Sequence, residues 1–164
     1  MNNSEIEQEL AEDGARDLLA NASLLRLAYN GNDGLPRAIP IGFFWDGAAI
    51  VVCTAVTSPK VRAIQHRPDV ALTIDEGGTP ADARSLLIRG RAEVEIVDGI
   101  PAEYLAGSRK TLPPDQVEVF ESAVTKMYAQ MARISIVPTW ARFYDFGAGR
   151  LPGFLLELAE RSGS

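Results

Sequence analysis

Short apolar runs separated by turn residues predict that most of the folded chain is β-strand. Alternation is clearest after Gly90, where Ala92, Val94 and Ile96 share one face and charged residues occupy the other. Glycine, asparagine and aspartate between several runs favour tight antiparallel connections. The predicted strands are 24–29, 37–45, 48–54, 70–75, 85–97 and 132–146. We therefore predict a mainly β fold, a small antiparallel Greek-key barrel with short helices between its strands.

Several other segments have helical spacing or capping residues. Residues 4–20 begin with a sequence that fits a capping box at Ser4 and carry a loose apolar stripe. Residues 59–66 and 101–110 are predicted to be short helices, and a clearer helix opens at 113–115. Its apolar face is Val117, Phe120, Val124, Met127, Tyr128 and Met131, with the methionines expected in the core. We expect a single domain over residues 1–164, with an N-terminal helix within 1–20 and a C-terminal tail at 151–164.

Proline and glycine mark three places where the predicted strands depart from regularity. Pro40 removes a ladder donor, so it indicates an edge, a bulge or a place where a ligand meets the backbone. Gly42 favours the last of these, because a residue without a side chain lets a flat group approach closely. Gly90, in the middle of a strand, predicts a bulge or a bend of the barrel.

Composition and charge narrow the range of partners. The chain has 164 residues, 46% of them apolar, which is enough to build a real core. A net charge of −6 disfavours nucleic acid and anionic membranes as main partners. Cys53 is the only cysteine, lies in an apolar run, and is expected to be a core residue rather than a nucleophile. We find no secretory leader pattern and no run long enough to span a membrane, so we expect a cytoplasmic protein.

The junction between the third strand and the first short helix after it has the chemistry of a phosphate site. Ser58 is placed to cap the helix, and Pro59 suits its first position. Lys60 adds a positive charge beside the first-turn amides, and Thr54 and Thr57 add hydroxyl groups. The alternative interpretation is an ordinary strand-to-helix turn with a solvated lysine.

The order of these segments resembles a known family. Arg37-Ala38-Ile39-Pro40-Ile41 is followed by a turn, by Ile50-Val51-Val52-Cys53-Thr54, and by Ser58-Pro59-Lys60. Arg67-Pro68 and Val70-Ala71-Leu72-Thr73 come next, and the last predicted strand contains 133–140. The set is similar to the flavin-binding split barrels typified by pyridoxamine 5′-phosphate oxidase. The resemblance covers about residues 18–152 and implies a split barrel of six to seven antiparallel strands.

The resemblance also implies a cofactor, a partner and a set of binding residues. It implies a homodimer with two equivalent cofactor sites between the subunits. FMN is the expected cofactor, and the deazaflavin coenzyme F-420 is the alternative, which many similar actinobacterial proteins use. The binding residues implied by matching positions are Arg37, Ile39, Pro40, Ile41, Thr54, Ser58 and Lys60.

Three departures from the oxidase pattern weaken the case for the oxidase reaction itself. The second-strand motif of the oxidase ends in a lysine where this chain has Gly42, and Pro59 replaces an arginine of its phosphate turn. The oxidase also has an arginine and a histidine near its end, and no such pair follows Trp140 here. We therefore expect that the protein is not a true pyridoxamine phosphate oxidase.

The remaining candidate residues do not form a catalytic set. His66 is expected to be a solvated residue at a helix C-terminus, and a lone histidine supports neither a hydrolytic triad nor a metal site. Trp45 and Trp140 are candidates for a cofactor wall or for core packing, and Arg142 for contact with an anion or with solvent. We therefore predict an oxidoreductase whose cofactor carries the hydride chemistry, with no catalytic side chain named. The alternative is a protein that binds flavin, haem or another flat ligand without turnover.

Overall fold

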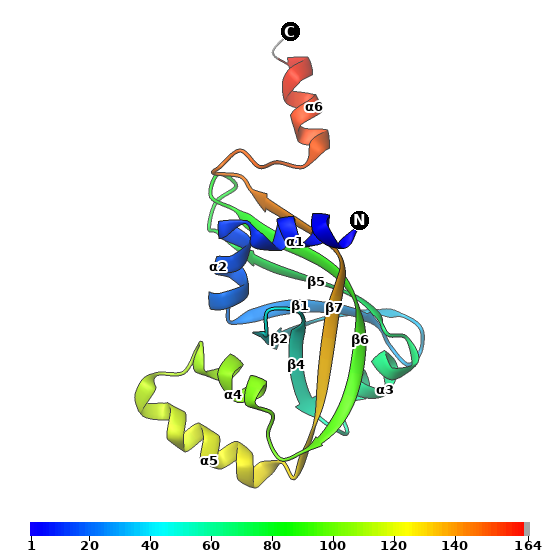
Figure 1. Ribbon diagram of the computed structural model, residues 1–164, viewed down its shortest axis with the longest axis vertical. Helices are drawn as coiled ribbons and strands as arrows, with labels where there is room; N and C mark the ends of the chain where they lie inside the picture. Colours follow the sequence, from blue (N-terminus) through cyan, green and yellow to red (C-terminus); the bar gives the residue numbers. More distant parts are fainter. Residues whose placement is uncertain (163–164) are drawn as a thin grey trace.

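The computed structural model describes residues 1–162 and builds them around one antiparallel sheet (Figure 1). The seven strands follow the order β2-β1-β5-β6-β7-β4-β3, and all neighbouring pairs are antiparallel. Their bounds are β1 Leu24–Asn30, β2 Pro36–Gly42, β3 Phe44–Trp45, β4 Ile50–Ala55, β5 Asp69–Glu76, β6 Arg84–Asp98 and β7 Gln130–Asp145. The predicted mainly β fold is thus confirmed.

Helices fill the connections and cover the curved sheet. The helices α1 and α2 lie across the end of the sheet near the N-terminus, and α4 and α5 form a hairpin between β6 and β7 (Figure 1). The last helix, α6, stands away from the rest of the chain (Figure 1). The bounds are α1 Asn3–Ala11, α2 Asp13–Asn21, α3 Pro59–His66, α4 Ala102–Arg109, α5 Val117–Met127 and α6 Gly153–Ser162. No helix within residues 1–162 has the length and apolar character needed to cross a membrane.

The core lies on the inner face of the curved sheet, where every second residue of a strand points. Leu25 and Leu27 of β1 and Ile134 and Ile136 of β7 have no solvent exposure. Leu18 and Leu19 of α2 close one end and are 1% exposed. Each such side chain contributes roughly 1.5–3 kcal/mol when it is fully buried.

The longest pairing, between β6 and β7, contains the bulge that Gly90 predicts. Arg89 pairs with Trp140 but Gly90 pairs with Pro138, so β7 has one extra residue at this point. A Cβ atom at Gly90 would lie 2.6 Å from Ile136 Cγ2 and 2.7 Å from the Val137 carbonyl oxygen. Because only glycine fits so close to the neighbouring strand, the bulge fixes where the sheet bends.

The sheet has two free edges that approach each other, and we call the space between them the seam. The strand β2 is the first in the sheet order, which confirms that Pro40 lies on an edge strand. At the other edge, β3 covers only Ile50 and Val51 of β4. Some Cα atoms of β2 and β4 lie within 8 Å of each other, although the two strands are not neighbours in the sheet. Beyond Val51, β4 therefore has no strand partner among the described residues on the side of the seam.

Three predicted element boundaries are wrong. The helix expected over 4–20 is two helices, because the backbone of Glu12 leaves the helical conformation, with φ −56° and ψ 137°. The capping box is made by Asn2 with Glu5 rather than at Ser4. The strand expected over 37–45 is interrupted at Phe43.

The helix expected to reach Met131 ends at Met127, because Tyr128 is already extended at the approach to β7. Met131 is buried on β7, whereas the expected core residue Met127 is 68% exposed. Met127 and Met131 are four residues apart, which is the spacing of one helix face, but the buried Met131 belongs to the strand that follows the helix.

Candidate cofactor site

Thr54, Ser58 and Lys60 come together where β4 ends and α3 begins. The ammonium group of Lys60 donates to Ser58 Oγ at 2.7 Å and to Thr54 Oγ1 at 3.4 Å. Burial lowers the pKa of Lys60, and within residues 1–162 no carboxylate pairs with it. A partly desolvated cation with two hydroxyl neighbours is suited to binding an anionic oxygen.

The helix start contributes less to this site than its sequence indicates. Ser58 stands at the N-cap of α3, but its hydroxyl makes no capping bond and instead accepts from Lys60. Pro59 has no amide hydrogen, and the Val61 amide donates to the Ser58 carbonyl at 3.0 Å. The lysine side chain is therefore the main source of attraction for an anion, and the helix amides are secondary.

Arg37 lies at the same end of the seam, but its charge is shared. Its guanidinium donates to Asp33 Oδ2 at 2.6 Å, and both side chains are partly exposed. Arg37 and Pro59 line the same small hollow, and Asn32 Nδ2 donates to the Pro59 carbonyl at 3.2 Å. An anion at Lys60 would meet Arg37 only in competition with Asp33.

The remaining predicted residues lie along β2. The side chains of Ile39 and Ile41 are half-buried and pack against the core, and Pro40 between them is exposed. Arg37 and Gly42 are five residues apart on this strand, which corresponds to roughly 17 Å. The predicted residues are thus spread along the seam, and a ligand in contact with all of them must be elongated.

The direction of the strands decides which groups share each end of the seam. β3 continues the course of β2 and pairs antiparallel with β4, so β2 and β4 run in opposite directions. The start of β2, with Arg37, therefore lies toward the Thr54 end of β4. The end of β2, with Gly42, lies toward Val51, and both of these residues line one cavity.

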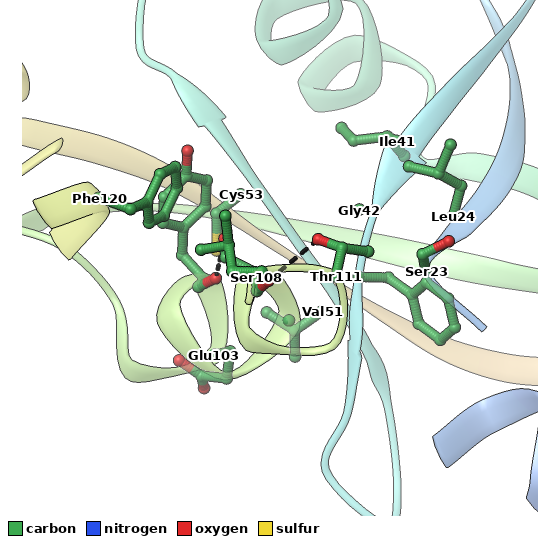
Figure 2. Close-up of a pocket in the computed structure, with 14 residues that line it drawn as sticks. Ser23, Leu24, Ile41, Gly42, Val51, Cys53, Glu103, Ser108, Thr111 and Phe120 are labelled. Carbon is green, nitrogen blue, oxygen red and sulfur yellow. Dashed lines mark hydrogen bonds between the residues drawn. The ribbon is translucent and has the colours of Figure 1, made fainter. Parts of the chain in front are cut away.

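This cavity, which we call the hairpin cavity, lies between the seam and the α4–α5 hairpin and has a volume of about 260 Å³ (Figure 2). Sequence reasoning placed Ile41 in the site but missed the helical wall opposite it. The available signal was Gly107, in the middle of α4, where a Cβ would lie only 2.8 Å from the Phe43 carbonyl oxygen. The residues that line the hairpin cavity are Ser23, Leu24, Ile41, Gly42, Phe43, Val51, Cys53, Glu103, Tyr104, Gly107, Ser108, Thr111, Leu112 and Phe120.

The ionisable groups in the hairpin cavity are held in their uncharged or paired forms. Burial raises the pKa of the Cys53 thiol to about 12, and the side chain is 8% exposed, in agreement with the prediction of a core residue. Burial also raises the pKa of Tyr104. The hydrogen bond from Arg133 holds the pKa of Glu103 below its ordinary value, at distances of 2.7 and 3.0 Å. None of these groups is poised for acid–base work near neutral pH.

The other candidates from the sequence lie outside this site. His66 is exposed at the end of α3, and its Nδ1 lies 2.7 Å from the Arg62 carbonyl. Trp140 is stacked by the Arg89 guanidinium at 4.6 Å, and Trp45 packs against the core. Arg142 is partly exposed and pairs with Glu9 at 2.9 Å, so it is not simply a solvated residue.

Known proteins share this fold. A family model described as pyridoxamine 5′-phosphate oxidase matches residues 11–132. No protein of curated function matches the sequence.

Many solved structures match this chain, among them the following three at low identity. A conserved hypothetical protein from Mycobacterium tuberculosis is 19% identical, with a TM-score of 0.63 over 93% of this chain and 89% of its own. An F-420 reductase is 24% identical, with a TM-score of 0.54 over 80% of this chain and 98% of its own. A haem-binding protein from Mycobacterium smegmatis is 21% identical, with a TM-score of 0.58 over 84% of this chain and 54% of its own. These likenesses confirm the split-barrel fold.

Proposed function

Because the chain belongs to the pyridoxamine 5′-phosphate oxidase family, we propose that it is an oxidoreductase that uses FMN or a deazaflavin to transfer hydride to or from a small organic molecule. The observation that carries the proposal is the Lys60 ammonium group with its two hydroxyl partners at one end of an open seam. The cofactor phosphate would bind there, and the ring system would extend along β2 toward Gly42. This path of roughly 17 Å suits an elongated cofactor with an anionic end.

The charge at the phosphate end bears on which cofactor is bound. The phosphate of FMN is a monoester with up to two negative charges, whereas the phosphate of coenzyme F-420 is a diester with one. Within residues 1–162 the Lys60 ammonium group has no carboxylate partner, Arg37 is held by Asp33, and Gly42 and Pro59 stand where the oxidase has basic residues. One ammonium group held by the hydroxyls of Ser58 and Thr54 matches a singly charged diester better, which favours the deazaflavin.

Each part of the protein would have a defined task in this reaction. When bound, the cofactor supplies the hydride chemistry. Lys60, Ser58 and Thr54 would fix its phosphate, and the free backbone groups of the seam would orient its ring. The α4–α5 hairpin would keep water from the ring. No side chain is assigned a proton transfer. Burial raises the pKa of Cys53 and Tyr104, so both stay protonated, and the hydrogen bond from Arg133 lowers the pKa of Glu103, so it stays ionised.

Cofactor titration and turnover test this function. We expect purified protein to bind FMN or coenzyme F-420 with a spectral shift, and the bound cofactor to be reduced and then reoxidised by an added organic acceptor. If both cofactors fail to bind at concentrations that saturate other flavoproteins, the redox function is wrong. If one of the cofactors binds but no acceptor reoxidises its reduced form, the protein is a cofactor carrier and not an oxidoreductase.

A non-catalytic haem-binding function is the second candidate. It is favoured by the likeness to the haem-binding protein and by the absence of a poised proton donor around the hairpin cavity. Iron in haem requires an axial ligand, and the only histidine of the chain, His66, lies outside this cavity. Haemin titration distinguishes the two candidates: a sharp Soret band that is lost in His66→Ala would support haem binding.

We further propose a homodimer with the cofactor sites between the subunits. In α6 the apolar residues Phe154, Leu156 and Leu158 are 44–63% exposed, and none of the helix residues is buried against the rest of the chain. A second copy would cover this apolar surface.

Sedimentation equilibrium is expected to give twice the mass of one chain. Replacing Phe154 and Leu158 together by serine should shift the equilibrium toward single chains, whereas Val119→Ser, at a still more exposed apolar residue on α5, should not. A single-chain mass at all concentrations would contradict the dimer. A dimer that persists in the double variant would exclude α6 from its interface.

A further inference from the structure

We propose that the hairpin cavity is the substrate site, and that it takes an uncharged aromatic molecule of one or two fused rings. The role as substrate rests on the proposed function, but binding to the cavity requires no cofactor and can be measured separately. The cavity is lined by strands of the seam on one side and by α4 and α5 on the other (Figure 2).

Two opposite walls of the cavity are suited to the faces of a flat ring. Figure 2 shows Ile41 and Leu24 on one side and Phe120 on the other, with Ser108 and Thr111 between them. The rings of Tyr104 and Phe120 stack on each other with centroids 6.1 Å apart and an angle of 21° between their planes. Aromatic surfaces of this kind favour stacked or edge-to-face contact with another ring.

The charges around the cavity disfavour an ion. Glu103, the only carboxylate among the lining residues, is bound by two nitrogens of Arg133. The Ser108 hydroxyl donates to the Tyr104 carbonyl at 2.8 Å, and the Thr111 hydroxyl donates to the Ser108 carbonyl at 3.1 Å. These hydroxyl oxygens can still accept one hydrogen bond each from a ligand. No lysine or arginine is among the lining residues, so an anion would lose its hydration without a cation in contact with it.

The wall nearest the seam is held in place before any ligand arrives. The ammonium group of Lys110 lies 3.8 Å from the centroid of the Phe43 ring and donates to the carbonyls of Leu19 and Ala22 at 3.2 and 3.4 Å. Gly107 packs directly on the Phe43 carbonyl. The cavity has a volume of about 260 Å³, just below the range of pockets for drug-sized ligands, roughly 300–1,000 Å³. This limits the ligand to one or two rings.

The hairpin cavity lies beside the end of the seam toward which the cofactor ring would extend, which suits it to hold the substrate. Ile41 and Gly42 line the cavity and also form the end of β2 toward which the cofactor ring would extend. An aromatic ligand stacked against Tyr104 and Phe120 would therefore lie beside that ring. This is the arrangement that transfer between two flat molecules requires.

The test uses 2-naphthol as a neutral probe and 2-naphthoate as its charged counterpart. Calorimetric titration of the protein free of cofactor should show 2-naphthol binding at least about tenfold more tightly than 2-naphthoate, because the anion is desolvated without a partner. Thr111→Trp, which fills the cavity, should weaken 2-naphthol binding by a similar factor. Thr125→Trp is the matched control, since Thr125 is exposed on α5 and, like Thr111, its hydroxyl donates to a backbone carbonyl of the preceding turn. It should leave the affinity unchanged.

Three results would overturn the proposal. These are equal binding of the two probes, equal effects of the two tryptophan variants, and displacement of 2-naphthol by FMN in direct competition. The last would make the cavity part of the cofactor site. If 2-naphthol binds as expected but neither FMN nor coenzyme F-420 binds at all, the cavity stands as an aromatic site and the proposed redox function fails. The two failures are thus distinguishable.

Discussion

Replacing Lys60 by alanine is expected to weaken the binding of FMN or coenzyme F-420 by about 1.5–3 kcal/mol, which is roughly 10- to 150-fold in the dissociation constant. The ammonium group is partly desolvated, has no carboxylate partner among the described residues, and is positioned by Ser58 and Thr54. A charged hydrogen bond to phosphate in such a place is stronger than one made at an exposed surface. Fluorescence titration of the purified variant measures the effect.

Two variants on the same helix control for charge and for helix stability. Arg62 is exposed on α3, so Arg62→Ala removes the same charge from the same element and should change the affinity by about twofold at most, since exposed charges are screened. His66→Ala should also have little effect. Equal losses in the Lys60 and Arg62 variants would indicate long-range attraction only. An unchanged affinity in Lys60→Ala would place the phosphate elsewhere.

The phosphate end of the site could be predicted from the sequence because its parts are close together along the chain. Thr54, Ser58 and Lys60 lie within seven residues, and a strand followed by a helix start brings such neighbours together in many folds. What could not be read is that the Ser58 hydroxyl would bind the lysine rather than cap the helix. That choice depends on where the lysine side chain is buried, which is a tertiary property.

The hairpin cavity could not be predicted, because its walls come from segments that are distant in the sequence. Ile41 and Phe120 belong to elements whose apolar residues have the same spacing as ordinary core residues. The sequence shows that Phe120 is on an apolar helix face, but not that this face meets a cavity. Only the approach of α4 to β2 and β4 decides that.

The N-terminal helices show the same limit for the fold. Strands with clear alternation, such as β6, were predicted almost to the residue. The burial of Glu9 could not be predicted, because its hydrogen-bond partners Arg142, Phe143 and Arg150 are more than 130 positions away in the sequence. Nothing in the local pattern distinguishes this carboxylate from the exposed Glu7 on the same helix.

Glu9→Ala is expected to lower the free energy of unfolding by about 2–4 kcal/mol at pH 7. Glu9 is 8% exposed, and its carboxylate accepts from the Phe143 amide at 2.8 Å, from Arg142 at 2.9 Å and from Arg150 at 2.8 Å. The alanine variant leaves the Phe143 amide without an acceptor. The two arginines are about two-fifths exposed and can turn to water, which keeps the loss below that of a fully buried ion pair. Urea unfolding measures it, and Glu7→Ala, the control on the same helix, should stay within about 0.5 kcal/mol.

The contribution of Glu9 should also depend on pH, with a definite sign. Burial alone would raise the pKa of Glu9, but the hydrogen bonds from Phe143, Arg150 and Arg142 together hold it below its ordinary value of 4.5. The folded protein therefore binds this proton less readily than the unfolded chain does, so the stabilisation is fully present above pH 4.5 and is lost as the pH falls through the folded pKa. The difference in unfolding free energy between the parent and Glu9→Ala should thus be constant from pH 7 to about pH 5 and shrink toward pH 3. A difference that stays the same at pH 3 would show that packing of α1 on β7, and not the carboxylate, stabilises this end of the barrel.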